Sequence, residues 1–147
     1  MADFMTNEQR SRAMSHVLGK ETEIELSLRK ILHNRGFRYK KNVSTLPGRP
    51  DIVLPKYKAV VFVNGCFWHG HIECRRSKLP EGNREFWEKK ISRTIERDRE
   101  KITELRIGGW RVAVAWQCCL NNNDSITNTG EILIEWLIHG NDWLEIP

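Results

Sequence analysis

Long hydrophobic runs are missing from this sequence, because no stretch of its 147 residues approaches the unbroken apolar length of a membrane-spanning helix. The first residues, Met-Ala-Asp-Phe-Met-Thr, lack the basic and apolar regions of a secretory signal peptide. Internal repeats and low-complexity linkers are also absent from the sequence. We therefore expect a single domain, residues 1–147, that acts in the cytoplasm and has no membrane partner.

Cysteine is sparse, occurring only at positions 66, 74, 118 and 119. In a reducing compartment such thiols are metal ligands or free thiols more often than disulfides. A chain of 147 residues can bury a core without staples. A metal site would therefore assist this fold rather than create it.

Charge of one sign is in modest excess: 24 Lys and Arg against 19 Asp and Glu give a net charge of +5 and a pI near 9.2. The basic residues come in groups, such as Arg75-Arg76 and Lys89-Lys90. Such groups suit a polyanionic partner, for example nucleic acid. A solvated basic face is the alternative.

Hydrophobic periodicity predicts an α/β protein. The pattern predicts helices over about 6–17, 22–35, 84–107 and 126–139, and strands over 37–41, 51–54, 59–63 and 110–116. A long helix between two strands implies a right-handed crossover that joins parallel strands. The last helix is expected to bury Ile132, Ile134, Trp136, Leu137 and Ile138, and the residues after it to form a tail.

The densest group of reactive side chains starts at Cys66, where two thiols and two imidazoles fall within a few positions. The group follows the apolar run 59–63, and α/β proteins place their sites at strand ends. Cys66, His71 and Cys74 offer three soft or borderline ligands, and Cys118 can supply the fourth if the strands before the two segments are parallel neighbours. This filled tetrahedron predicts a structural zinc site. Unpaired buried thiols are the alternative.

Asp51 follows Gly48-Arg49-Pro50 and begins a strand whose other residues are apolar. An acid at the head of a buried strand needs a partner, and a hard divalent cation is a suitable one. Pro-Asp at a strand start, followed by a second apolar strand, is the front half of the PD-(D/E)xK nuclease pattern, in which the acid holds magnesium against the scissile phosphate. Asp is also common at strand entries as a turn residue.

A second acid, Asp98, falls on the apolar stripe of the predicted helix 84–107. A carboxylate on a core face must be paired. If zinc takes the other ligands, His69 can be the partner, and a histidine oriented by an acid is suited to general-base chemistry. A salt bridge from Asp98 to Arg93 or Arg97 is the alternative.

Glu25 shares a helix face with Leu28 and Leu32, at i+3 and i+7. Its side chain should therefore point inward or to the edge of the core. There it could hold a metal-bound water or make a boundary salt bridge.

Aromatic residues gather beside the predicted sites: Phe67 and Trp68 in the Cys/His segment, and Phe86 and Trp87 at the start of the long helix. Aliphatic residues already fill the main core faces, so some of these rings can be displayed. Displayed aromatics beside basic groups suit stacking on bases or wedging between base pairs. Burial in the core is the alternative for each ring.

Taken together, the motifs closely resemble the very-short-patch-repair (Vsr) DNA mismatch endonucleases. They run in one order within residues 10–137: Leu46-Pro-Gly-Arg-Pro-Asp51, Phe62-Val-Asn-Gly-Cys-Phe-Trp-His69, Glu85-Phe-Trp87, Glu96-Arg-Asp98-Arg, Gly109-Trp-Arg-Val112 and Trp116-x-Cys118. The resemblance implies a magnesium-dependent, strand-specific endonuclease that nicks DNA 5′ of the thymine in a T·G mismatch. Such mismatches arise when 5-methylcytosine deaminates, and the nick starts repair.

The resemblance also implies a restriction-endonuclease-like fold, a mixed central β-sheet flanked by helices, with a structural zinc ion and magnesium at the cut. Its partner would be double-stranded DNA with a T·G mismatch, which places the protein at the nucleoid. A mismatch lacks two-fold symmetry, so we expect a monomer. Mismatch-repair proteins are further candidate partners.

By position, the resemblance assigns catalytic roles. Asp51 would hold magnesium together with the backbone carbonyl of Val63, and Glu25 would bind metal-associated water. His69 would activate the attacking water, with Asp98 orienting it.

The same comparison implies the DNA contacts. Phe67, Trp68 and Trp87 would intercalate beside the mismatch from the major groove. Met14, in an N-terminal arm over residues 1–20, would approach the minor groove, and Lys90 would contact base edges.

This chain departs from the pattern at two places. Phe62-Val63-Asn64 occupies the position of the E-x-K half of the nuclease motif, and Asn64 cannot act as an imidazole where some members carry histidine. Cys74 lies one residue farther from His71 than the pattern requires, which a flexible loop should absorb. Two alternative functions follow: a zinc-stabilised, non-catalytic binder of distorted DNA, and a restriction-type endonuclease that cuts paired sites.

Overall fold

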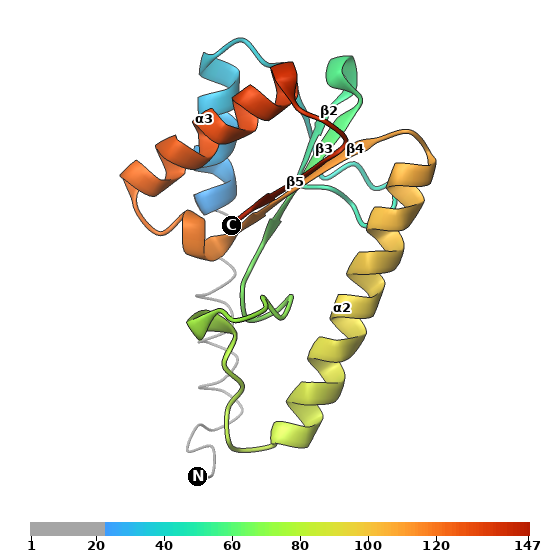
Figure 1. Cartoon of the computed structure of the whole chain (residues 1–147), viewed down its shortest axis with the longest axis vertical. Coiled ribbons are helices and arrows are strands. Elements are labelled where there is room, and N and C mark those ends of the chain that lie inside the picture. The colour runs from blue at the N-terminus through green and yellow to red at the C-terminus, as the bar shows by residue number, and fades with distance from the viewer. Residues whose placement is uncertain (1–22) are drawn as a thin grey trace.

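The structure is a computed structural model, and it describes residues 23–147. The predicted helix over 6–17 and the arm that carries Met14 lie outside the described residues. Figure 1 shows a central sheet with helices on both of its faces. The predicted α/β class is thus confirmed.

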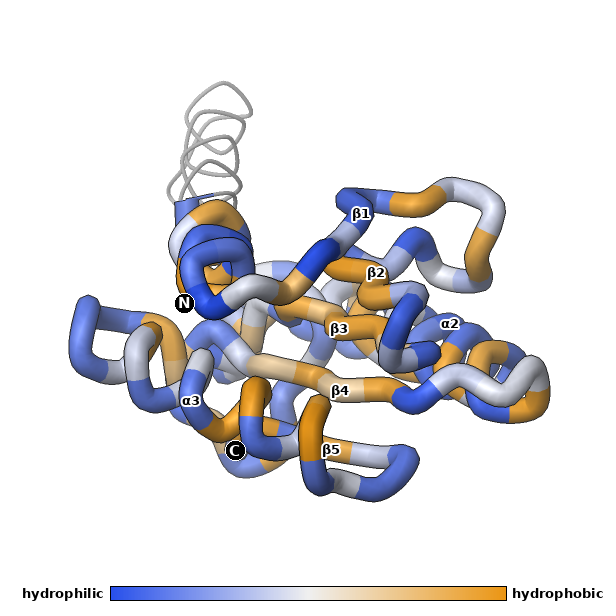
Figure 2. The backbone as a smooth tube through the Cα atoms, turned by 90° about the horizontal axis from the view of Figure 1, so that it is seen from above, coloured by the Kyte–Doolittle hydropathy of each residue, from blue (hydrophilic) through white to orange (hydrophobic). Residues whose placement is uncertain are grey.

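The sheet has five strands in the order β1-β2-β3-β4-β5. Their bounds are Lys40–Lys41 for β1, Ile52–Leu54 for β2, Ala59–Asn64 for β3, Arg111–Trp116 for β4 and Trp143–Ile146 for β5. β1, β2 and β3 pair antiparallel, whereas β3, β4 and β5 pair parallel, so the sheet is mixed. Figure 2 shows the hydrophobic residues concentrated on the central strands.

Helices cover the two faces of the sheet because the side chains of each strand alternate between them. On one face Val61 and Val63 pack in a core with Leu28 and Leu32, from the helix over 23–34, and with α3 (Asn123–His139). On the other face Val60, Val112 and Val114 pack with Leu105 of α2 (Arg84–Ile107). α2 is the predicted crossover between the parallel strands β3 and β4.

Two expectations about the C-terminal part were wrong. Residues 143–146 are not a tail but the strand β5, which pairs with the free edge of β4. In α3, Ile132 is 38% and Ile138 54% exposed, and Leu133, with no exposure, is buried instead. The helical period turns 133, 134 and 137 toward the sheet and leaves 132 and 138 at the boundary.

The sheet register places the functional segments side by side. Asn64 at the end of β3 pairs with Trp116 at the end of β4, so the segment after each strand leaves the same edge of the sheet. In the described part of the chain, no helix is long and apolar enough to cross a membrane.

Candidate active site and metal centre

The Cys/His segment forms one side of a compact metal-ligand group. Cys66, His71, Cys74 and Cys118 place their ligand atoms all within 4.8 Å of one another. Cys118 Sγ lies 3.6 Å from His71 Nδ1, although the two residues are 47 positions apart in the chain. Three thiols and one imidazole could hold a metal ion in tetrahedral geometry. Cys119 lies outside this group and packs against the opposite core.

Backbone turns bring these ligands together. His71 N–H donates to the Cys66 carbonyl at 2.9 Å, and Cys74 N–H donates to the His71 carbonyl at 3.3 Å. Between His71 and Cys74 the chain turns at Glu73, which adopts φ +58°, and Cys74 reaches the ligand group. The Ser77 hydroxyl then donates to the same His71 carbonyl at 2.6 Å.

The electrostatics of the group suit a cation. Burial raises the pKa of the Cys66 thiol to about 12, so a thiolate there needs a compensating positive charge. Burial also lowers the pKa of His71, against the opposing effect of Glu145, and the neutral imidazole is the form that ligates metals.

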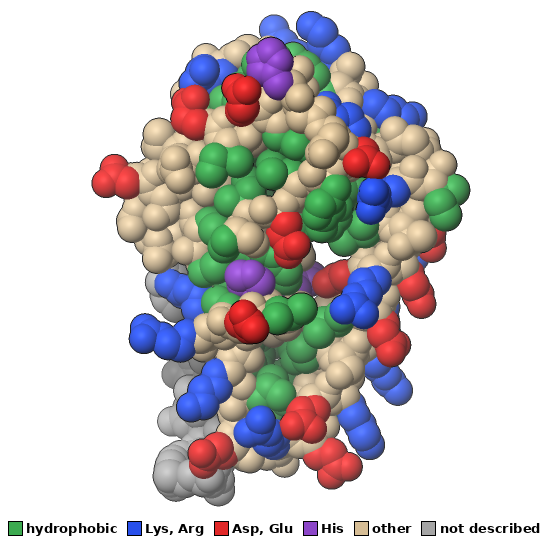
Figure 3. Space-filling view, in the orientation of Figure 1, with side chains coloured by type: hydrophobic (Ala, Val, Ile, Leu, Met, Phe, Trp, Pro, Cys, Tyr) green, Lys and Arg blue, Asp and Glu red, His purple; other side chains and the backbone are tan. Residues whose placement is uncertain are grey.

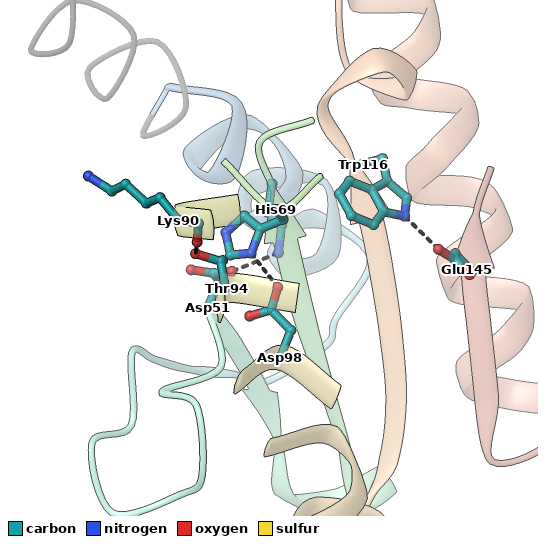
Figure 4. A network of polar contacts seen from close by, with 8 residues as sticks. Asp51, His69, Lys90, Thr94, Asp98, Trp116 and Glu145 are labelled. Atoms are coloured by element: carbon teal, nitrogen blue, oxygen red, sulfur yellow. Dashed lines mark hydrogen bonds and ion pairs between the residues drawn. The ribbon is translucent and has the colours of Figure 1, made fainter. Parts of the chain in front are cut away.

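Trp116 and Glu145 hold the His71 ring of the metal-ligand group in place. The His71 and Trp116 rings stack with centroids 4.1 Å apart and planes 9° apart. Trp116 Nε1 donates to Glu145 Oε2 at 2.7 Å, from β4 to β5 (Figure 4). Sequence reasoning missed Glu145 because the segment that carries it was expected to be a tail.

The predicted catalytic residues line one cavity of about 410 Å³. They come from four segments of the chain: Glu25, Asp51, Val63, His69 and Asp98 all lie on its wall. Three basic residues, Arg49, Arg97 and Lys101, line it as well. The tertiary structure thus brings together carboxylates, an imidazole and cations at the end of β3, a combination suited to chemistry on a phosphate.

Asp51 connects the two strands at the base of this cavity. Its Oδ2 accepts a hydrogen bond from the Val63 N–H at 2.6 Å. Burial raises the pKa of the Asp51 carboxyl, and the Val63 hydrogen bond, Arg29, His69 and Glu25 oppose that rise. A carboxylate in this position would gain from a divalent cation.

Asp98 pairs with His69, as predicted, and not with Arg93 or Arg97. The His69 Nδ1 and Asp98 Oδ2 atoms are 2.6 Å apart, with about a third of each side chain exposed. Figure 4 shows the His69 ring between the side chains of Asp51 and Asp98. The acid therefore fixes the ring through Nδ1, and Nε2 is the ring nitrogen not engaged by Asp98.

A hydrogen-bonded turn aims the two histidines in different directions. His69 N–H donates to the Gly65 carbonyl, and Gly70 N–H to the Phe67 carbonyl. Gly70 has φ +59°, and a Cβ there would lie 2.7 Å from atoms of Ile91 and Ile95. Glycine is therefore needed at this position, between the catalytic candidate His69 and the metal-ligand candidate His71.

Glu25 makes the boundary salt bridge that was one of its two alternatives, and its place on the cavity wall leaves the other, a metal-bound water, as a prediction. Glu25 lines the cavity, and its Oε2 also lies 3.3 Å from Arg29 Nη2. Sequence reasoning missed Arg29. The signal was available, because Arg29 lies four residues after Glu25 and between the buried Leu28 and Leu32.

The aromatic residues pack against one another. Phe67 and Trp68 have ring centroids 5.2 Å apart, and Trp87 lies 5.4 Å from Phe67 and 6.1 Å from Trp68. Trp87 is 7% exposed, whereas Phe86 is 57% exposed. Lys90 Nζ lies within 6 Å of the Trp68, Phe86 and Trp87 ring centroids. Phe67, Trp68, Phe86 and Trp87, with Lys90, thus form a cation-capped aromatic group. Within it the core alternative holds for Trp87, which is buried, whereas Phe86 is displayed and Phe67 and Trp68 are half-buried.

Basic residues continue along α2 beyond the aromatic group. Figure 3 shows Lys and Arg side chains interspersed with acidic ones along this edge of the molecule. A shallow pocket there is lined by Phe86, Lys89, Lys90, Arg93, Thr94 and Arg97. Positive charge therefore extends from the rings to the cavity that holds Asp51.

Comparisons with known proteins all point to the same protein family. The family model described as DNA mismatch endonuclease Vsr matches residues 2–76. The chain is 39% identical to the DNA mismatch endonuclease Vsr of Escherichia coli (strain K12), over 93% of this chain and 88% of that protein. It is 47% identical to the type II nicking enzyme V.NmeAIP of Neisseria meningitidis, over 83% and 86% of the two chains. It is 43% identical to the type II nicking enzyme V.XorIIP of Xanthomonas oryzae pv. oryzae, over 83% and 89%.

Proposed function

Because the chain belongs to the DNA mismatch endonuclease Vsr family, we propose that it nicks one DNA strand 5′ of the thymine in a T·G mismatch and so starts very short patch repair. The observation that carries the proposal is the convergence of Asp51, His69 and Asp98 on one cavity beside a basic helix face. Mismatched DNA is the expected partner, and the protein would act on it as a monomer.

Asp51, the Val63 carbonyl and a water held by Glu25 would bind Mg²⁺ in this cavity. When bound, Mg²⁺ supplies positive charge that stabilises the developing charge on the scissile phosphate. The carboxylates that line the cavity fit this ion, which prefers oxygen ligands. The Val63 N–H bond fixes one Asp51 oxygen and so orients the carboxylate.

His69 would take a proton from the attacking water at Nε2. Asp98 holds the opposite ring nitrogen and stabilises the imidazolium that forms. This pair would serve where the E-x-K half of the nuclease motif is absent and Asn64 offers no imidazole.

Zn²⁺ would bind Cys66, His71, Cys74 and Cys118 as a structural ion. Four protein ligands complete a tetrahedron and leave no position for substrate. The ion would tie the end of β3 to the end of β4 and thereby hold the turn that carries His69.

The restriction-endonuclease-like fold is part of the same proposal. The mixed sheet has helices on both faces, and Asp51 precedes β2 as the motif acid should. Val63 then lies on the next strand, β3, and its N–H donates a hydrogen bond to the carboxylate of that acid.

The cation-capped aromatic group would be the mismatch wedge. Phe67 and Trp68 would enter the stack from the major groove, and Lys90 would reach the base edges. Trp87, which the resemblance places in the stack with them, is buried here and would instead support the two rings from behind. Basic residues of α2 would neutralise phosphates on the way to the cut. Met14 and the N-terminal arm would meet the minor groove, a contact that involves residues outside the described range.

The test is a nicking assay on duplexes that carry a single T·G in randomised sequence context, with T·A and C·G controls, in Mg²⁺ and in EDTA. We expect Mg²⁺-dependent nicks 5′ of the mismatched thymine. Asp51→Asn should abolish them and leave mismatch binding intact, and His69→Ala should slow turnover by about 100-fold or more.

Two results would contradict the proposal. Mismatch binding with no Mg²⁺-dependent product would favour the zinc-stabilised binder. Cleavage of both strands in fully paired controls would favour the restriction-type endonuclease. The candidate protein partners are tested separately: on a native gel, binding of a purified mismatch-repair protein would slow the migration of this protein.

A further inference from the structure

Arg29 is a buried cation behind the catalytic cavity. Arg29 lies on the helix over 23–34, and only 5% of the residue is exposed. Among the described residues, Arg29, Asn64 and Thr129 are the polar or charged residues that are buried. Arginine is seldom buried unless it is paired, because desolvation of the charge is expensive. Its position therefore calls for a specific role.

The Arg29 guanidinium joins two predicted catalytic residues. Nη2 lies 3.3 Å from Glu25 Oε2 and donates to the main-chain carbonyl of Asp51 at 3.0 Å. Glu25 belongs to the helix over 23–34 and Asp51 to the segment that enters β2, so one group connects two separate elements. Both residues line the 410 Å³ cavity, and Arg29 lies outside it.

The bonding of Arg29 is incomplete for a structural arginine. Its Nε is buried and has no hydrogen-bond partner among the described residues. A purely structural side chain in this position would be expected to satisfy its donors. The two bonds that Arg29 does make go to the Glu25 carboxylate and to the main chain of Asp51, so the buried charge holds the positions of these two residues relative to each other.

We propose that Arg29 is a positioning residue of the active site, which clamps the Glu25 carboxylate against the start of β2 so that Glu25 and Asp51 face the same metal-associated water. The inference rests on the proposed nuclease function. It deepens that function by adding a residue that touches neither substrate nor metal and acts through Glu25.

A positioning role and a structural role predict different results for Arg29→Met. Methionine has a similar length and removes the buried charge, and replacement of a buried ion pair by apolar groups is often neutral for stability. The double variant Arg29→Met/Glu25→Gln, which removes both charges of the pair, should therefore have a melting temperature near that of the wild type. A positioning role requires turnover to fall even though the fold survives.

The experiment measures single-turnover nicking of a T·G duplex for the wild type, Arg29→Met, Arg29→Lys, Glu25→Gln and the double variant Arg29→Met/Glu25→Gln. We expect Arg29→Met to slow nicking by about 10- to 100-fold. Arg29→Lys should recover part of that rate. In the Glu25→Gln background, Arg29→Met should have little further effect, because the residue acts through Glu25.

Two readouts are independent of activity: mismatch binding in EDTA, and the rise in melting temperature that Mg²⁺ produces. Binding should stay within about twofold of wild type for every variant, whereas Arg29→Met should reduce the Mg²⁺-induced rise. Arg35→Met is the matched control, since Arg35 pairs with Glu131 in an exposed salt bridge away from the cavity. It should leave nicking and the Mg²⁺ response unchanged.

The proposal is overturned if Arg29→Met nicks at the wild-type rate, or if the effects of Arg29→Met and Glu25→Gln simply multiply. Parallel loss of stability, binding and nicking in Arg29→Met, without rescue by Arg29→Lys, would also overturn it in favour of a structural role. If the wild type itself does not nick, the proposed function fails. The Mg²⁺-induced melting shift then still decides whether Arg29 supports a metal site.

Discussion

Asp51 combines burial with charge, and this combination controls how its carboxyl responds to pH. Desolvation raises its pKa above the ordinary 3.8, although the Val63 hydrogen bond, Arg29, His69 and Glu25 favour the ionised form. A carboxyl with a raised pKa binds its proton more tightly in the folded state than in the unfolded state. In the absence of metal, folding stability should therefore fall as the pH rises from about 3.8 through the folded-state pKa.

We predict that Asp51→Asn removes this pH dependence. The introduced amide oxygen can still accept from the Val63 N–H, so the strand contact is kept while the titrating group is lost. In EDTA the variant should become more stable relative to the wild type as the pH rises through this range. Melting temperature against pH for both proteins measures the effect, and a constant difference would mean that Asp51 is not the titrating group.

Gly70 controls the orientation of His69 and His71 through a steric effect. Gly70→Ala would place a Cβ 2.7 Å from Ile91 Cγ2 and Ile95 Cδ1, at a φ of +59°. We expect a loss of about 1–3 kcal/mol in the free energy of unfolding, together with weaker nicking, because the turn must shift away from α2. Chemical denaturation measures the first effect and the nicking assay the second.

Gly36→Ala is the control for Gly70→Ala. Gly36 also has a positive φ, +85°, but no atom lies within 4 Å of a Cβ built there. It should show the backbone strain of a left-handed residue alone. Equal losses in the two variants would indicate that contact with Ile91 and Ile95 is unimportant.

At the scale of single elements, the four-residue strand β5 contributes both to the sheet and to the metal-ligand group. It covers the parallel edge of β4, and Glu145 holds the Trp116 indole that stacks on His71. Outer-shell partners of this kind orient metal ligands and commonly affect metal affinity by about 10- to 100-fold. β5 therefore connects the C-terminal part of the fold to the metal-ligand group.

We predict that Glu145→Ala weakens zinc retention by about tenfold without loss of the fold. Glu145→Gln keeps an acceptor for Trp116 Nε1 and should retain most of the affinity. Competition with a chromogenic chelator measures affinity, and tryptophan fluorescence reports the Trp116 environment. Identical affinities for the wild type and both variants would show that the Trp116–Glu145 bond does not support the metal ligands.

At the scale of the whole molecule, two separate cores stabilise the sheet, and the thiols of the metal-ligand group belong to the second core or pack against it. One contains the helix over 23–34 and α3, and the other contains α2. Cys66 belongs to the second core and is fully buried, so the proposed zinc ion adds to a fold that already has an interior. Its loss should loosen the molecule rather than unfold it.

We predict that zinc removal, or Cys66→Ser, lowers the melting temperature. The far-ultraviolet circular dichroism at ambient temperature should stay close to that of the native protein. Zinc content by atomic absorption should fall from one ion per chain to none. The spare thiol allows a control, Cys119→Ser, which should retain the ion because Cys119 lies outside the ligand group. Complete unfolding on chelation would show that the metal creates the fold.

The sequence predicted much of this arrangement, because many of its signals are local. α2 has the expected bounds, 84–107, since its hydrophobic stripe and the glycines after it depend on nearby residues only. The four candidate metal ligands were identifiable from their spacing and from the ends of two strands. β5 was missed because four residues carry too little periodicity to stand out without the strand beside them.

The chain by itself determined which chemical groups are available: an acid before a buried strand, clustered thiols and imidazoles, aromatics and positive charge. The tertiary structure alone decided which groups meet. It paired Asp98 with His69 rather than with an arginine, buried Arg29 between Glu25 and Asp51, and packed Trp87 behind Phe67 and Trp68. Composition and spacing are local properties of the chain, whereas these pairings join side chains from different elements and depend on the packing of helices against the sheet.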